Sequence, residues 1–79
     1  GLATEEVEAA VTYPLESAML GATGVQQVRS QSAFALSIVI VEFTWGTDPR
    51  VARQVVQERI ATVAADLPPD VRPQMTPIS

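Results

Sequence analysis

The stretch from Leu36 to Thr44 restricts the fold more than any other part of the sequence. Most of its residues are β-branched or apolar at consecutive positions, which predicts a strand that is covered on both faces, in the middle of a sheet. The preceding stretch, about residues 25–32, is polar and predicts an outer strand beside it. Residues 33–35 are the expected connection, although they lack the Asn-Gly type of hairpin signal.

An amphipathic helix is predicted over about residues 4–20. Thr4 is the expected N-cap, and the acidic residues after it suit the positive end of the helix dipole. Pro14 cannot donate to the helical ladder and crowds the carbonyl four residues earlier, so a kink is expected there. Gly21 and Gly24 are expected to end the helix and to begin a turn. The apolar stripe of this helix comprises Val7, Val11, Pro14, Leu15 and Ala18.

A second helix is predicted over about residues 48–67, with Asp48 as its N-cap and Pro49 at its first position. Two prolines at 68–69 end it, and residues 71–76 can provide one short edge strand, since Pro73 is incompatible with a central one. The expected buried stripe is Ala52, Val55, Val56, Ile60, Val63 and Leu67. The expected outward-facing residues are Arg50, Arg53, Gln57 and Glu58.

The order helix, strand, strand, helix, optional strand predicts an α+β fold, a ferredoxin-like βαββαβ unit that lacks its first strand. In the complete fold the first strand lies between the third and the fourth, so its absence leaves the edge of the strand at 36–44 unpaired and apolar. We therefore expect the isolated chain to self-associate, as a strand-swapped or dimeric form. With 79 residues the chain makes at most one small domain, residues 1–79.

Composition excludes several classes of function. The net charge is −4 at pH 7 and the five arginines are scattered, which disfavours nucleic acid and anionic membrane surfaces as partners. The absence of cysteine and histidine excludes disulfides, thiolate or imidazole metal ligands and histidine-based catalysis. The longest apolar run, residues 33–41, is less than half of the roughly 20 residues that a membrane-spanning helix needs. The start at Gly1, without a signal-peptide pattern, is typical of an internal piece or a processed product.

Two groups of residues are candidates for holding metal ions. Met19 and Met75 are soft donors that suit Cu(I) or Ag(I), but methionine commonly fills gaps in a core. Glu5, Glu6 and Glu8 are hard oxygen donors, but acidic side chains in a first helical turn are expected from the helix dipole. We interpret both groups as structural and assign no metal-binding residue.

Candidates for catalysis or ligand stacking are equally sparse. Glu42 lies in a predicted strand and Glu58 in a predicted helix, and neither has a partner base in the sequence. Tyr13 and Trp45 offer aromatic rings, which more often serve packing than ligand stacking. We therefore assign no catalytic or cofactor-binding residue, expect no cofactor and do not expect an enzyme.

An ordered series of short segments resembles the heavy-metal branch of the resistance-nodulation-division (RND) efflux transporters, of the CusA and CzcA kind. The series covers nearly the whole chain, and its order is more specific than any single segment. In the first half it comprises Gly1-Leu2-Ala3, Glu5-Glu6-Val7-Glu8, Val11-Thr12-Tyr13-Pro14-Leu15-Glu16 and Gly24-Val25-Gln26-Gln27-Val28-Arg29-Ser30. In the second half it comprises Gly46-Thr47-Asp48, Ala52-Arg53-Gln54-Val55-Val56-Gln57-Glu58-Arg59, Leu67-Pro68-Pro69 and Pro77-Ile78-Ser79.

The resemblance implies that residues 1–79 are part of the first porter subdomain of the periplasmic portion. It implies a homotrimer in the bacterial inner membrane that is driven by proton influx, works with a periplasmic adaptor and an outer-membrane channel, and exports heavy-metal cations. The helix at 48–67 would lie toward the central pore of the trimer. The methionine ligands of copper-exporting relatives belong to other porter subdomains, so no site residue is carried over. The alternative is a ferredoxin-like small-ligand regulatory or protein-interaction module.

Overall fold

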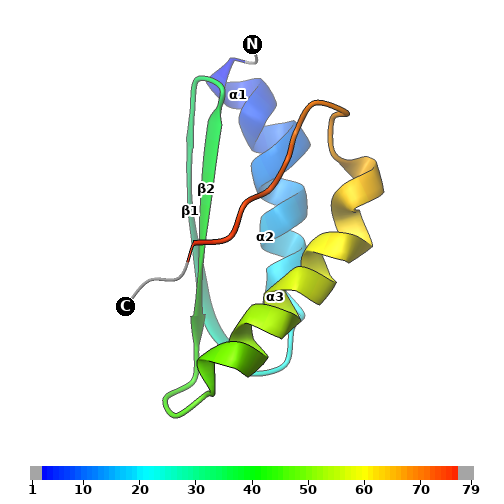
Figure 1. Ribbon diagram of the computed structural model, residues 1–79. Coiled ribbons are helices and arrows are strands. Elements are labelled where there is room, and N and C mark those ends of the chain that lie inside the picture. The colour runs from blue at the N-terminus through cyan, green and yellow to red at the C-terminus, as the bar shows by residue number, and fades with distance from the viewer. Residues whose placement is uncertain (1–2, 77–79) are drawn as a thin grey trace.

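The computed structural model describes residues 3–76 and consists of two helical segments beside a β-hairpin. The first helical segment is continuous and is made of α1 (Thr4–Val7), the π-helical turn η1 (Glu8–Thr12) and α2 (Tyr13–Leu20). The hairpin consists of β1 (Val25–Ala33) and β2 (Leu36–Phe43), and the second helical segment of α3 (Pro49–Val63) and the 3-10 turn η2 (Ala64–Asp66). Figure 1 shows both helical segments on one side of the hairpin, as in an α+β fold. The marker residues 1–2 and 77–79 lie outside the described part.

The first helix occupies the predicted range, but its start and its middle differ from expectation. The N-cap position is Ala3 and not Thr4, and the Glu6 carboxylate accepts a hydrogen bond from the Ala3 backbone nitrogen at 3.3 Å. The disturbance expected at Pro14 takes the form of the π-helical turn, in which the Tyr13 nitrogen donates to the carbonyl oxygen of Glu8, five residues earlier. This wider turn accommodates Pro14 in the helix, because the proline has no backbone N–H to donate to the helical hydrogen bonds.

The strands pair in an antiparallel register that brings Ser32 opposite Ser37 and Val28 opposite Val41. The two-residue connection, Phe34 and Ala35, places Ala35 in the left-handed region with φ 57°. Within residues 3–76, β2 pairs only with β1. The predicted strand at 36–44 is therefore present, but within residues 3–76 its other edge forms no backbone hydrogen bonds with a neighbouring strand.

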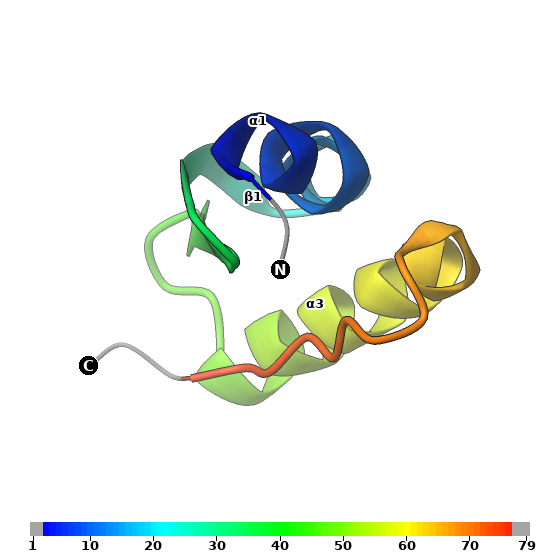
Figure 2. The same ribbon diagram turned by 90° about the horizontal axis from the view of Figure 1, so that it is seen from above.

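Residues 71–76 do not form the predicted edge strand. Seen from above, this segment runs along α3 and ends away from β2 (Figure 2). Pro73 has no backbone N–H to donate, and in a ferredoxin-like sheet the strand at this position pairs with the first strand, which the described residues lack. The segment is thus left without a neighbour to pair with.

The core is small and belongs mainly to the first helix. Val7, Val11, Leu15 and Leu67 form the buried cluster, and partly buried Val39 and Ile60 pack against it. Within Pro49–Val63, all of which is described, no side chain is buried. Leu67 is the one residue of the predicted buried stripe on the second helix that is buried. The others stay partly exposed because part of the face of α3 opens onto a groove.

Candidate functional site

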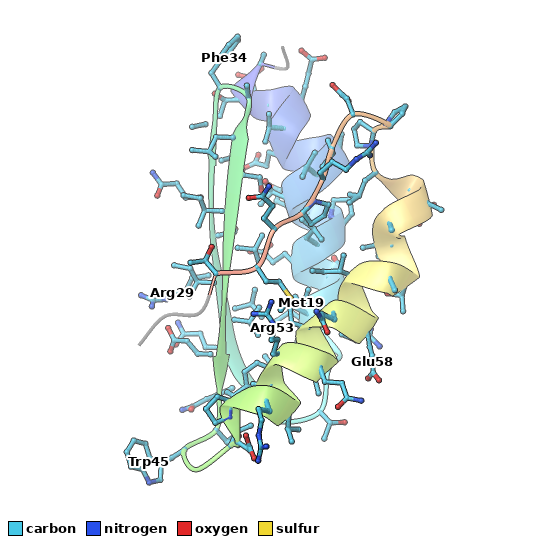
Figure 3. The ribbon with its side chains drawn as sticks, in the orientation of Figure 1. Met19, Arg29, Phe34, Trp45, Arg53 and Glu58 are labelled. Carbon is cyan, nitrogen blue, oxygen red and sulfur yellow. The ribbon has the colours of Figure 1, made fainter. Side chains whose placement is uncertain are left out.

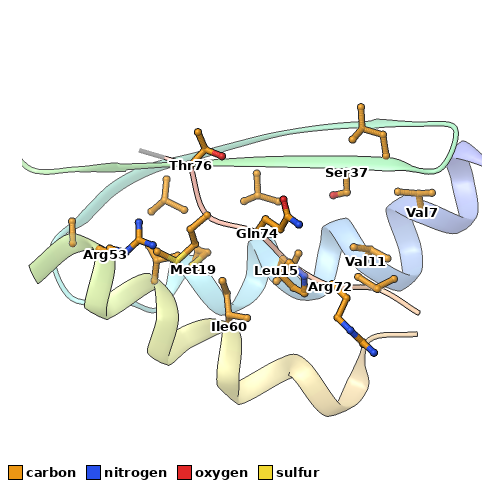
Figure 4. A pocket seen from close by; sticks show the side chains of 18 of the residues that line it. Val7, Val11, Leu15, Met19, Ser37, Arg53, Ile60, Arg72, Gln74 and Thr76 are labelled. Atoms are coloured by element: carbon orange, nitrogen blue, oxygen red, sulfur yellow. The ribbon is translucent and has the colours of Figure 1, made fainter. Parts of the chain in front are cut away.

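The groove lies between β2, the first helix, α3 and residues 70–76, and encloses a volume of about 1170 Å³ (Figure 4). Its β2 wall is formed by Val39, Val41 and Phe43, which alternate along the strand and so point to the same face. Two helical ridges face this wall, one from each helix. The ridges comprise Val7, Val11, Leu15 and Met19 on the first helix and Ala52, Val56 and Ile60 on α3. The four-residue spacing aligns each ridge along its helix.

A cluster of three hydroxyl groups lies near the hairpin turn, and one of its members, Ser37, lines the groove. Thr12 is 1% exposed, and its Oγ1 lies 2.9 Å from Oγ of Ser32 and 2.7 Å from Oγ of Ser37. The two serines face each other across the hairpin, so Thr12 links both strands to the first helix. Sequence reasoning missed this cluster because Thr12 falls outside the apolar stripe of a regular helix. The only available signal was Pro14, since the π-helical turn before it carries Thr12.

Arg50 and Arg53 line the opposite end of the groove. Figure 4 places Arg53 near Met19 and Thr76 at this end, whereas Ser37 lies toward the other. Arg50 is held by Asp48, whose Oδ2 lies 3.4 Å from its Nη2 and whose Oδ1 accepts from its backbone nitrogen at 2.8 Å. No ion pair of Arg53 is formed within residues 3–76. Both arginines were predicted to face outward, but they line the groove while staying exposed.

The outer face of the sheet, opposite to the helices, is partly apolar. Ile38 is exposed to 42%, and Arg29 and Glu42 form an ion pair further along the strands. Phe34 and Trp45 are exposed at opposite ends of the hairpin (Figure 3). The side chains of Phe34, Ile38 and Trp45 are thus presented to solvent.

The structure places the two methionines at the groove and leaves the acidic candidates apart. Met19 is buried, Met75 is half-buried, and both line the groove as parts of its apolar surface. Glu5 and Glu6 are exposed, and Glu8 is half-buried. Across the described part of the chain, no three acidic side chains come together as a possible metal site.

The catalytic and stacking candidates do not converge either. Glu42 is paired with Arg29 on the sheet, whereas Glu58 accepts from Nε2 of Gln54 on α3 at 3.4 Å. Tyr13 is half-exposed, and a hydrogen bond to the carboxylate of Glu8, with the charge of that carboxylate, raises the pKa of its hydroxyl. These residues therefore do not share a site.

The fold and the groove define an incomplete ferredoxin-like subdomain, in which the place of one strand beside β2 is open. The model of the AcrB/AcrD/AcrF family matches residues 1–79, and the chain belongs to this family. The resemblance to its heavy-metal branch is confirmed.

Several curated proteins of this branch match nearly the whole chain. It is 47% identical over 79 residues to the cation efflux system protein CzcA of Alcaligenes sp. (strain CT14), which covers 100% of the chain. It is 45% identical over 74 residues, 94% of the chain, to the nickel and cobalt resistance protein CnrA of Cupriavidus metallidurans. It is 43% identical over 77 residues, 98% of the chain, to the cation efflux system protein CusA of Escherichia coli (strain K12). The chain spans 7% of the length of each of these relatives.

Among the helices of residues 3–76, none combines the length and the apolar character that crossing a membrane requires.

Proposed function

We propose that the chain is a periplasmic segment of a proton-driven RND transporter that exports heavy-metal cations across the cell envelope. The observation that carries the proposal is the similarity over the whole chain to proteins named for cation efflux and for cobalt, zinc, cadmium and nickel resistance. Because the chain spans 7% of such proteins, the transport activity belongs to the longer protein. The segment itself would contribute structure and conformational cycling, without chemistry of its own.

Within that transporter we assign residues 1–79 to the first porter subdomain. The arrangement of residues 3–76 supports this assignment, because two helical segments cover one face of a hairpin. The edge of β2 that is opposite to β1 is unpaired within these residues. The helix at 49–63 carries an apolar face that the described residues cover only in part. Such a helix suits a position between neighbouring parts of a larger assembly.

The assembly proposed for the longer protein is a homotrimer in the bacterial inner membrane, joined by a periplasmic adaptor to an outer-membrane channel. Membership of the AcrB/AcrD/AcrF family supports this arrangement. The acidic net charge of −4 is compatible with protein partners and unfavourable for nucleic acid.

The test is metal tolerance conferred by the full-length gene that encodes this chain. The gene is expressed in a Gram-negative host whose own RND exporters are deleted, together with its adaptor and channel genes. We expect a higher tolerance of at least one of copper, silver, zinc, cobalt, nickel and cadmium. A variant with a charge in the core, Leu15→Asp, should lose this tolerance because the segment no longer folds. Unchanged tolerance of all six metals, with the protein present in the membrane, would contradict the proposal.

A further inference from the structure

The turn between β2 and α3 presents a tryptophan entirely to solvent. Trp45 is fully exposed and points away from the rest of the molecule, at the end of the hairpin opposite to Phe34 (Figure 3). The backbone nitrogen of Thr47 donates to the carbonyl oxygen of Thr44 at 3.2 Å, and the Thr47 hydroxyl donates to the same oxygen at 2.7 Å. Gly46, with φ 87°, takes the position of this turn that requires a positive φ. These contacts fix the backbone that carries the ring.

Further exposed apolar and cationic side chains follow directly after this turn. α3 begins there (Figure 1), and Val51 in its first turn is exposed to 51%. The side chain of Arg50 is 93% exposed, and Arg53, one helical turn further on, is exposed as well. We call residues 44–53 the tryptophan end of the molecule.

The acidic charge of the chain lies elsewhere. The first helix carries no Lys or Arg and four glutamates, Glu5, Glu6, Glu8 and Glu16. The five other acidic residues are balanced by the five arginines, so the net charge of −4 belongs to the first helix. That helix starts at the opposite end of the molecule from Trp45 (Figures 1 and 3). The tryptophan end itself has two arginines and one aspartate and is therefore cationic.

Tryptophan is enriched both at protein interfaces and at the interface between membrane and water. In a protein interface, the anchoring ring is surrounded by further contacts that exclude water from it. Trp45 stands at the tip of a turn, and beside it a Cβ added to Gly46 would meet no atom within 4 Å, so such a surround is missing. A lipid headgroup layer adapts to the shape of an amphipathic ring, and its phosphates pair with arginine. The tryptophan end therefore fits lipid better than protein.

We propose that the tryptophan end contacts the headgroup layer of a phospholipid membrane, with Trp45 as the interfacial anchor and with Arg50 and Arg53 paired with lipid phosphates. The proposal rests on the proposed function for the presence of a membrane beside the chain, and it adds the surface that faces this membrane. The acidic net charge, which disfavours anionic membranes for the chain as a whole, does not apply to this end. The contact ties the start of α3 to the membrane surface.

The experiment uses the full-length protein in vesicles of phosphatidylcholine and phosphatidylglycerol, with or without bromine on the acyl chains near the headgroups. Bromine quenches tryptophan emission on contact, and the emission of Trp45 is obtained as the difference between the wild type and Trp45→Phe. We expect brominated lipid to quench this difference at least about twofold, whereas iodide in the water quenches it little.

The matched control moves the tryptophan to the opposite end of the hairpin. Phe34→Trp, combined with Trp45→Phe, places an exposed ring there. Its emission should be quenched by iodide and not by brominated lipid. Equal quenching of the two rings by brominated lipid would show no preference for the tryptophan end and would overturn the proposal.

The arginines are tested with the same measurement. Arg50→Gln and Arg53→Gln should each reduce the quenching of Trp45 by brominated lipid, because each variant loses a pairing with lipid phosphate. The matched control is Arg72→Gln, an exposed arginine that Figure 4 places away from Arg53. Unchanged quenching in both test variants would refute the phosphate contacts, even if Trp45 itself lies in lipid.

Two other environments of Trp45 give different results. If the turn stands free in water, iodide quenches its emission and brominated lipid does not. If another protein surface covers the ring, neither quencher reaches it. Either result overturns the membrane contact. Metal tolerance is measured independently on the same wild type. Intact tolerance without quenching by lipid refutes the contact alone, and quenching by lipid without tolerance of any metal refutes the efflux function alone.

Discussion

Nε of Arg59 donates a hydrogen bond to the backbone oxygen of Ala18 at 2.7 Å, across 41 positions of the sequence. Ala18 lies in the last turn of α2, where carbonyl groups lack partners within the helix and carry the negative end of the helix dipole. The guanidinium therefore fastens α3 to the end of α2. This contact matters because α3 contributes no buried side chain that could hold it in place.

Replacing Arg59 with methionine keeps most of the apolar stem and removes the donor. We expect the free energy of unfolding to fall by about 1–2 kcal/mol, since a charged donor at a helix end is lost from a half-buried position. Denaturant unfolding followed by circular dichroism measures this change. Arg50→Met is the matched control and should cost less than about 0.5 kcal/mol, because its ion pair with Asp48 is exposed. Equal losses in the two variants would contradict the bridging role of Arg59.

The sequence was sufficient to predict the elements whose signals are local. The start of α3 is an example, because Asp48 accepts from the Arg50 nitrogen and Pro49 occupies the first helical position as expected. The first helix and both strands also lie within about one residue of their predicted ranges. In each case, side-chain periodicity or a capping residue within a few positions determines the element.

What the sequence could not predict depends on contacts between distant segments. Arg53 was assigned to the solvent side of α3 from helical periodicity and is exposed as expected, but its place in the lining of the groove could not be predicted. The predicted strand at 71–76 does not form, because its pairing partner is missing from the described residues. The spacing of apolar residues along the sequence describes one helix or strand at a time. It does not show which neighbouring segment that element packs against or pairs with.

The hydroxyl cluster gives the second prediction. Thr12→Val keeps the shape of the side chain but leaves the hydroxyls of Ser32 and Ser37 without their common partner. We expect a loss of about 1–3 kcal/mol in the free energy of unfolding, measured by denaturant titration. Ser17→Ala, an exposed site on the same helix, should change it by less than about 0.5 kcal/mol.

The triple variant Thr12→Val, Ser32→Ala, Ser37→Ala tests the mechanism behind this loss. It removes every member of the cluster, so no hydroxyl is left buried without a partner. We expect the triple variant to be more stable than Thr12→Val with the two serines intact. Strictly additive losses would show that the three hydroxyl groups act independently of one another.

The third prediction concerns the single tyrosine of the chain. The carboxylate of Glu8 accepts from the Tyr13 hydroxyl and raises its pKa, because it stabilises the protonated form. Glu8→Gln should therefore lower the pKa of Tyr13 toward its ordinary value, as read from the ultraviolet absorbance of the phenolate. Because the folded-state pKa is raised, the contribution to stability is present below the unfolded pKa and is lost as the pH rises through the folded value. Glu5→Gln is the control and should leave the titration of Tyr13 unchanged.

The last prediction concerns the inner edge of β2, between Leu36 and Phe43. In an antiparallel pair only alternate residues of a strand donate to the neighbouring strand, and the others point away from it. Since β1 is the partner of β2 within residues 3–76, hydrogen exchange of the isolated chain should show slow and fast amides in alternation along β2. The fast amides should be those that face the groove, and in the full-length protein we expect the same amides to become slow, as the assignment to a ferredoxin-like subdomain predicts. Uniform protection along β2 in the isolated chain would mean that another segment already pairs with this edge, whereas uniform fast exchange would mean that the hairpin with β1 does not persist in solution.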